Sequence, residues 1–266
     1  MGITKEGKVA VLTNYREDLG HQAVGAQSRG VIVNSWLAAS SPPAEQQRQT
    51  TRDFVDGVIR SITATKVGGF SLVCGYLNEP LAIVSNRSSD TEQIPWVATE
   101  PGQTLGLSNT SFDDRSWPKI LDGERLVKEA IGDHVQAGED EEGLVARLLE
   151  VLSKDTLPRL SDDGSGTSDT YGPYLRNSIF IPMIGAERTQ GGTDEISDPC
   201  VDTQARVGNQ LDPSYTQGAY GTQKQTVLLV RDDMRVRYFE RTLYDQNANA
   251  IPVGKGDRSF EFTAGQ

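Results

Sequence analysis

The order of strand-like and helix-like segments is the feature that most constrains how this chain can fold. Residues 7–14 (GKVAVLTN) alternate and carry β-branched side chains, which is typical of a strand. Residues 44–64 carry apolar side chains at helical spacing, and Gly68-Gly69 is expected to end that helix. Short extended runs separated by turn residues then follow at 70–76, 81–85, 94–99 and 104–107.

The rest of the chain continues this irregular order. Residues 29–39 are expected to begin extended and then turn helical. Trp117-Pro118 opens a helix, because proline suits a first helical turn, and residues 143–153 predict a second, amphipathic helix. Further strands are expected at 178–182 and in a long hairpin of 225–230 and 236–242. Since strands do not alternate regularly with helices, a doubly wound parallel sheet is disfavoured, and the order predicts an α+β fold with helices packed on antiparallel sheets.

Long polar stretches suggest how the chain is divided. The mean hydropathy is −0.45, which is polar for a chain with one core. Residues 185–217 are rich in Gly, Thr, Asp and Gln and have little periodicity, so we interpret them as an insertion. We therefore expect a single domain over residues 1–246, with this polar insertion, followed by a polar C-terminal tail over residues 247–266.

Charge and hydrophobicity exclude several classes of partner. The formal net charge is −11, and the sequence pI is about 4.7. Non-specific nucleic-acid binding depends on Lys and Arg neutralising phosphates, so nucleic acid is not expected as a partner. The N-terminus has no apolar signal region, and no apolar stretch approaches the length of a membrane span. We accordingly expect a cytoplasmic protein with no transmembrane segment.

Cysteines and histidines are few. Cys74 lies in an apolar run and Cys200 is distant from it, so we interpret Cys74 as a buried structural thiol and expect no disulfide framework. The two histidines, His21 and His134, supply a metal site poorly, and no metal site is predicted. There is no GxSxG nucleophile motif, no GxGxxG after a strand and no P-loop.

Three polar segments stand at the ends of predicted strands, where functional sites often lie. They are residues 13–17 (TNYRE), 106–110 (GLSNT) and 219–222 (AYGT). From the residue types alone, turn formation and helix capping are the favoured explanation of each segment, and a functional site is the alternative.

The same segments resemble blocks of a known family. The run Gly2-Ile3-Thr4-Lys5 with Gly7, Ala10 and Leu12–Glu17 resembles its signature GITKxGxxAxLTNYRE. Further blocks follow in the family's order at Arg29-Gly30 with Val33, Gly69–Val73, Gly106–Asn109 with Trp117–Lys119, Ser178–Ile181, and Tyr220–Thr222 with Thr226–Val230. On these blocks the chain resembles the NRDE family, of the transport-and-Golgi-organisation type.

The resemblance implies a fold and a missing segment. Family members are similar to N-terminal-nucleophile hydrolases of the choloylglycine-hydrolase type, an αββα sandwich of antiparallel sheets flanked by helices. Their first residues carry a Met-Cys start and the Asn-Arg-Asp-Glu motif. Met1 of this chain precedes Gly2 and occupies the x position of the family's GTW-x-GITK run. We therefore expect an N-terminally truncated form that lacks the first hairpin and the terminal Cys nucleophile.

The resemblance also implies site residues. Asn109 matches the asparagine that donates to the oxyanion in the hydrolase relatives. Asn14, Arg16 and Glu17 of the first block are expected to bind a ligand. So are Tyr220 and Thr222 of the last block, where Gln223 stands in place of the family's usual arginine.

The resemblance implies a role in Golgi organisation and protein secretion, non-catalytic in this form, with no resident cofactor. Its expected partner is a small molecule or protein of the secretory or mitochondrial system, and its expected location is the cytoplasm, the Golgi or the mitochondrion. One alternative is an N-terminal-nucleophile amide or thioester hydrolase whose Cys lies upstream of Met1. Another is a haem or lipid trafficking factor, with His21 or His134 as the axial haem ligand. A third is a degenerate fragment with no stable fold.

Overall fold

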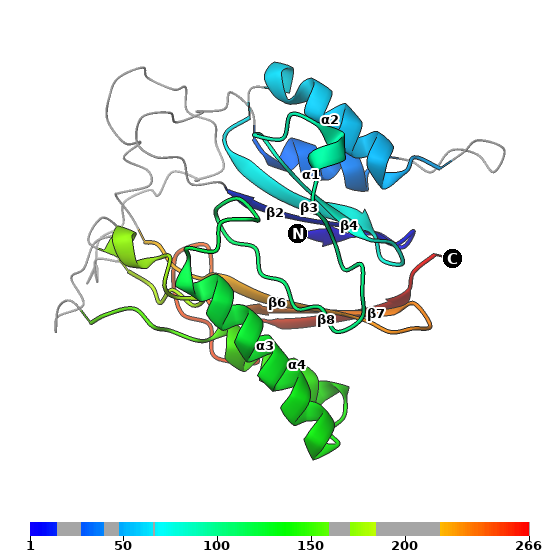
Figure 1. Cartoon of the computed structure of the whole chain (residues 1–266). Coiled ribbons are helices and arrows are strands. Elements are labelled where there is room, and N and C mark those ends of the chain that lie inside the picture. Colours follow the sequence, from blue (N-terminus) through cyan, green and yellow to red (C-terminus); the bar gives the residue numbers. More distant parts are fainter. Residues whose placement is uncertain (15–27, 40–47, 66, 160–170, 185–218, 266) are drawn as a thin grey trace. The chain divides into compact units, whose positions relative to one another are not determined.

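The computed structural model of the chain forms two compact units (Figure 1). The structure describes residues 1–14, 28–39, 48–65, 67–159, 171–184 and 219–265. The first unit comprises Met1–Ser116 together with Leu228–Arg237 and Phe260–Gln266. The second comprises Trp117–Val227 and Tyr238–Ser259.

The first unit contains a five-stranded antiparallel sheet in which neighbouring strands follow the chain order. Its central pair aligns Lys8 with Tyr76 at one end and Asn14 with Phe70 at the other. The strands are β1 (Gly2–Ile3), β2 (Lys8–Asn14), β3 (Phe70–Tyr76), β4 (Leu81–Ser85) and β5 (Trp96–Val97). The predicted strands at 7–14, 70–76 and 81–85 are confirmed, and 70–76 pairs with 81–85 as an antiparallel hairpin.

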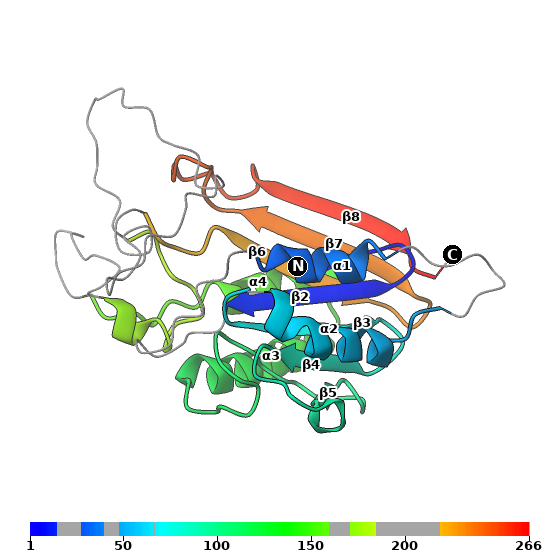
Figure 2. The same ribbon diagram turned by 90° about the horizontal axis from the view of Figure 1, so that it is seen from above.

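Two helices cover one face of this sheet, as Figures 1 and 2 show: α1 (Gly30–Leu37) and α2 (Thr51–Thr65). Trp36 of α1 is fully buried, and its indole N–H donates to the carbonyl of Val9 at 3.1 Å. The Trp36 ring lies 4.8 Å from Phe54 and 5.2 Å from Tyr76, between centroids. This aromatic group packs on the strand side chains that alternate toward the helices, and it forms the main core of the unit.

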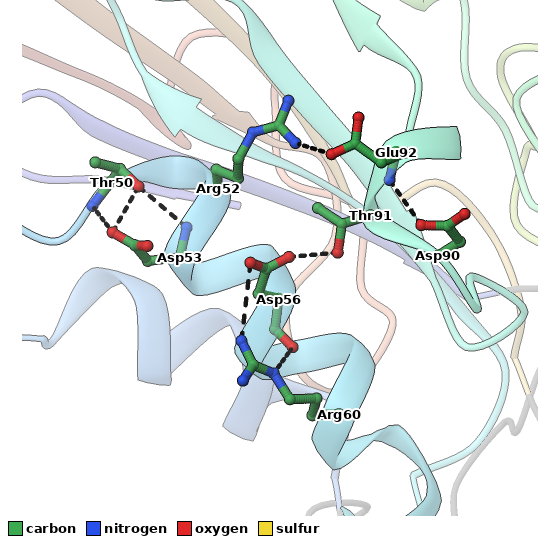
Figure 3. A network of polar contacts seen from close by, with 8 residues as sticks. All are labelled: Thr50, Arg52, Asp53, Asp56, Arg60, Asp90, Thr91 and Glu92. Atoms are coloured by element: carbon green, nitrogen blue, oxygen red, sulfur yellow. Dashed lines mark hydrogen bonds and ion pairs between the residues drawn. The ribbon is translucent and has the colours of Figure 1, made fainter.

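The start of α2 is fixed by side chains (Figure 3). Thr50 donates its hydroxyl to Asp53 at 2.7 Å, and the Asp53 amide donates to the Thr50 hydroxyl at 3.1 Å, which is a reciprocal capping arrangement. Asp56, one turn on, accepts from the hydroxyl of Thr91 in the 3₁₀ helix η1 (Thr91–Gln93). These contacts explain why the helix begins at Thr51 and tie it to the segment before β5.

The second unit is built around a helical hairpin of α3 (Pro118–Ala137) and α4 (Glu141–Leu152). Pro118 occupies the first helical position, as predicted. Gly138 ends α3 with φ of 63°, a left-handed conformation that glycine adopts without strain. Asp140 caps α4 by accepting from the amide of Gly143 at 3.0 Å. A short 3₁₀ helix, η2 (Gly172–Tyr174), follows.

A second sheet has the strand order β6 (Lys224–Val230), β7 (Arg235–Thr242) and β8 (Asp257–Thr263). β6 and β7 form the predicted hairpin around 231–234. A Cβ atom on Gly256 would lie 2.4 Å from the Thr242 carbonyl oxygen, so the approach of the chain to β7 needs glycine here.

Several local expectations are wrong. Residues 30–37 are helical from the start, because Trp36 must turn inward to reach Val9. The strand expected at 94–99 is only Trp96–Val97, and 104–107 and 178–182 form no strand. The polar segment 247–266, expected to be a tail, contains β8, whose exposed positions hid the strand periodicity.

Candidate functional site

A group of polar residues lies at one end of the first sheet, where β2 ends and β3 begins. The register pairs Asn14 with Phe70 and Thr13 with Ser71. The loop after β5 reaches the same place. We call Thr13, Asn14, Ser71, Ser108, Asn109 and Thr110 the strand-end cluster.

Hydrogen bonds join the loop to both strands. Asn109 donates its side-chain N–H to the carbonyl of Asn14 at 2.9 Å. Thr13 donates its hydroxyl to the carbonyl of Ser108 at 3.1 Å, and Ser71 donates to the carbonyl of Thr110 at 3.2 Å. Because residues 95 apart in sequence meet here, two of the three polar segments form one site rather than separate turns.

Further contacts fix the edges of the cluster. Thr110 donates its hydroxyl to the carboxylate of Asp114 at 2.6 Å, which folds the loop back on itself. Arg29, just before α1, donates from Nε to the carbonyl of Gly69 at 2.8 Å. The blocks of the chain that contain Asn14, Arg29, Gly69 and Asn109 therefore meet at one end of one sheet.

An apolar hollow of about 270 Å³ lies beside the cluster in the same unit. Side chains two apart on a strand share a face, so Val73 lies on the same face of β3 as Ser71, and Ile83 is its partner on β4. This is the face opposite α1 and α2, since Leu72 and Cys74 pack against those helices. Gln103 is the polar side chain among the residues that line the hollow, which are Val73, Leu81, Ile83, Val97, Ala98, Gln103, Leu105, Gly106, Leu107 and Phe112.

Cys74 is a buried structural thiol, as predicted. Its side chain is fully buried in the core under the helices. Burial raises the pKa of the Cys74 thiol to about 12, because the thiolate would lose its hydration. The thiol is therefore protonated at neutral pH and is a poor nucleophile. Cys200 lies outside the described residues.

The predicted site residues separate into three groups. Asn14 and Asn109 meet in the strand-end cluster. Arg16 and Glu17 lie outside the described residues. Tyr220 and Thr222 belong to the second unit, where Tyr220 bridges to Ile184 and Thr222 accepts from the amide of Ile181 at 2.9 Å.

Of the two histidines, His21 lies outside the described residues. His134 lies in the last turn of α3, with Nδ1 3.7 Å from the Glu139 carboxylate, and it belongs to the second unit. The part of the chain that the structure describes contains no group of three or more His, Cys, Asp or Glu placed to hold a metal ion. Among the same described residues, no helix has the length and apolar character that crossing a bilayer requires.

Apart from Gly106 and Leu107 of the segment 106–110, the residues that line the hollow were not predicted from the sequence. A signal for them was present in β3, whose residues 70–76 (FSLVCGY) carry no charged side chain on either face. A strand of this kind is covered on two sides, whereas strict alternation marks a strand with one solvated face. Val73 and Ile83 could have been placed on the second face by their alternation with Leu72 and Ala82.

Comparison with known proteins gives consistent matches over nearly the whole chain. Residues 1–245 match the profile of the family described as Transport and Golgi organisation 2. The human Transport and Golgi organization protein 2 homolog is 26% identical over 272 residues, covering 99% of this chain and 77% of the relative. The mouse Transport and Golgi organization 2 homolog is 23% identical, with coverage of 99% and 77%. An uncharacterized protein of Saccharomyces cerevisiae is 22% identical, with coverage of 98% and 80%. The chain therefore belongs to the Transport and Golgi organisation 2 family.

Proposed function

We propose that this chain acts in Golgi organisation and protein secretion as a non-catalytic protein that binds a small amphipathic molecule in its first unit. The observation that carries the proposal is the apolar hollow of about 270 Å³ beside the strand-end cluster. Ligand sites in proteins combine an apolar lining with a few polar groups that fix orientation. The names of the human and mouse relatives support the cellular role, and a cytoplasmic, Golgi-associated location follows from it.

The arrangement suits a ligand with an apolar body and a polar head. Val73, Ile83 and Leu107 would contact the apolar body. Asn109 would contact the head: its Nδ2 already donates to Asn14, and among the described residues no hydrogen bond reaches its Oδ1. A lipid-like molecule fits this description, which favours the lipid-trafficking alternative over haem.

The chemistry of the cluster supports a binding role. The hydroxyls of Thr13, Ser71 and Thr110 each donate to a carbonyl or a carboxylate within the unit. A hydroxyl nucleophile needs a base that accepts its proton, commonly a histidine. Among the described residues, the strand-end cluster supplies no activated nucleophile. Cys74 supplies none either, because burial raises the pKa of its thiol.

Titration with a fluorescent fatty-acid analogue tests the binding site. We expect saturable binding, and we expect Leu107→Trp, which fills the hollow, to raise the Kd about tenfold or more. Leu121→Trp, at an exposed position of α3, is the matched control and should leave the Kd unchanged. Equal binding by wild type and Leu107→Trp would remove the hollow as the site.

A cell experiment tests the proposed role. Cells that express only the Leu107→Trp chain should secrete a reporter protein more slowly than cells that express wild type or Leu121→Trp, at equal protein levels. If Leu107→Trp loses ligand binding but the cells still secrete normally, the hollow has no role in secretion.

The second candidate is an N-terminal-nucleophile hydrolase, and the position of Asn109 favours it. Its amide lies at the end of β2, where the resemblance puts an oxyanion donor. That chemistry requires a terminal Cys as its nucleophile. A longer version of the chain with the Met-Cys start should hydrolyse amide or thioester substrates, and Asn109→Ala should slow it about a hundredfold. No turnover by the longer chain would discard this candidate.

Haem binding stays a prediction that depends on His21 or His134. Titration with haem should produce a shift of its Soret band if either histidine ligates the iron. The absence of a shift at micromolar protein would discard it.

A further inference from the structure

A small pocket of about 40 Å³ lies in the second unit. It is lined by α3 and by the segments that follow α4 and η2. Leu126 of α3 and Ile179, from the segment after η2, supply its apolar lining, and both residues are half-buried. The Ile179 side chain lies against α3 at Gly123, where a Cβ atom would stand 3.7 Å from its Cδ1. Separate parts of one unit therefore form a pocket with an apolar interior.

Charged side chains of both signs line the same pocket. Asp122 and Arg125 come from α3, and Lys154 comes from the segment after α4. A nitrogen of Arg125 lies 3.6 Å from the Asp122 carboxylate, and another lies 2.8 Å from that of Glu129. Since Asp122 and Glu129 balance Arg125 and Lys154, this lining does not favour a ligand whose charge has a single sign.

Two donors of the pocket are available to a ligand. Among the described residues, no hydrogen bond or ion pair reaches the amine of Lys154 or the side-chain amide of Asn177. The main chain at Asn177 is fixed, because its N–H donates to the carbonyl of Tyr174 at 2.8 Å and its carbonyl accepts from the hydroxyl of Thr156 at 2.8 Å. An ammonium and an amide N–H that line one pocket suit a carboxylate.

An acceptor lines the pocket from α3. The 3.6 Å between Asp122 and Arg125 is longer than a hydrogen bond, so the Asp122 carboxylate can still accept from a ligand. Among the described residues, Asp122 and Lys154 line the same pocket without forming an ion pair with each other. A carboxylate and an ammonium that are held apart on a lining without net charge match a ligand that carries both charges.

The volume limits the apolar part of such a ligand. A site needs about 10–15 Å³ on this measure to hold one water molecule, so 40 Å³ admits about three non-hydrogen atoms. An isopropyl group has that size. Its attached charged groups would stay at the rim, where the charged side chains lie.

We propose that this pocket binds a free α-amino acid with a short branched aliphatic side chain, of the valine type. The ligand's side chain contacts Leu126 and Ile179, its ammonium pairs with Asp122, and its carboxylate accepts from Lys154 and Asn177. Because exposed ion pairs contribute little each, we expect a Kd of the order of 1 mM. This pocket lies in the second unit and is independent of the hollow in the first.

A ligand series with the wild-type whole chain tests the proposal. Binding of L-valine is followed by the methyl NMR signals of Leu126 and Ile179. Isobutyrate and isobutylamine carry the same isopropyl group with one charge each, so we expect each to bind about three- to fivefold more weakly. Binding of either one as tightly as L-valine would overturn the assignment of a doubly charged ligand. Signals that do not move with L-valine would overturn the pocket as a site.

Variants assign the two charges. Lys154→Met should raise the Kd for L-valine about three- to fivefold but leave that for isobutylamine unchanged, because isobutylamine has no carboxylate. Asp122→Asn should weaken L-valine equally and leave isobutyrate unchanged.

Lys128→Met and Asp133→Asn are the matched controls. They remove the same charges from exposed positions of α3 that do not line the pocket, and they should leave every Kd unchanged. Equal losses in the control variants and the pocket variants would overturn the proposal. The ligand series decides the matter with the wild-type chain even if a pocket variant folds poorly.

Discussion

Two regions of this molecule place a lysine beside a helix end, Lys8 fully buried and Lys119 half-buried, and they do so in opposite ways. Lys8 of β2 lies at the C-terminal end of α1, where its amine donates to the carbonyls of Trp36 at 3.2 Å and Ala39 at 2.7 Å. Lys119 lies at the N-terminal end of α3 without an acceptor among the described residues. The cation therefore lies at the negative end of a helix dipole in the first region and at the positive end in the second.

The difference separates a charge that hydrogen bonds compensate from one that they do not. Burial lowers the pKa of both lysines. At Lys8 two carbonyls at the negative end of the helix accept from the ammonium, so they partly offset its loss of hydration and tie α1 to the sheet. At Lys119 nothing comparable among the described residues offsets the loss of hydration, so its charge opposes folding.

The largest expected effect is the loss of stability in Lys8→Met. The change leaves the buried carbonyl of Trp36 without its donor and removes the cation from the end of α1. We expect the free energy of unfolding to fall by about 2–3 kcal/mol. Urea denaturation measures it, with Lys5→Met, at an exposed position of the same segment, as a control that should change by less than about 0.5 kcal/mol. A Lys8→Met chain as stable as wild type would show that the hydrogen bonds of Lys8 do not set it apart from Lys119 in their effect on stability.

Lys119→Met is expected to act in the opposite direction and to depend on pH. The pKa of Lys119 is about 8 in the folded chain and about 10.4 in the unfolded chain, so the unfolded chain binds more protons between these values. The free energy of unfolding of wild type should therefore rise with pH across this window, relative to the variant. At pH 7 the variant should be more stable by about 1–2 kcal/mol, and this advantage should vanish above about pH 10. An advantage that is constant from pH 7 to pH 10 would contradict the assigned cause.

Adding an acid to α3 should make its first turn more like the surroundings of Lys8. Leu121→Glu places a carboxylate in the exposed first turn, where it compensates the helix dipole and stabilises the helix by about 0.3–1 kcal/mol. It should also raise the midpoint of the Lys119 titration, followed by NMR of its side chain, by about half a unit. Leu121→Gln is the uncharged control and should leave the midpoint in place. A midpoint that moves equally in both variants would point to lost packing.

The smallest expected effect follows from removing the aromatic ring beside Lys119. Trp117→Leu removes a contact that favours the ammonium, so the pKa of Lys119 should fall by a few tenths of a unit. The midpoint of the NMR titration of the Lys119 side chain measures this fall, in variants with matched circular dichroism spectra. An upward shift would mean that the ring mainly excludes water from the amine.

Local patterns predicted the strands and helices whose boundaries local chemistry decides. The short extended run at 70–76 between turn residues and the Trp117-Pro118 start identified β3 and α3, because turns and helix starts depend on neighbours in sequence. The start of the helix over residues 30–37 was predicted wrongly, because the contact of Trp36 with Val9 decides it. β8 was not predicted, because it is held by pairing with β7. Of the expected site, the contact of Asn14 with Asn109 depended on the strand register.

The sequence by itself determined the α+β class, the family and the polar segments, because these depend on residue types and their order along the chain. The tertiary structure decided which of those segments meet, and on which face of the sheet the apolar hollow lies. It also decided which of the two lysines has partners. Lys8 and Lys119 are the same residue type in ordinary sequence surroundings, and they differ because hydration, helix dipoles and hydrogen-bond acceptors are set by three-dimensional neighbours.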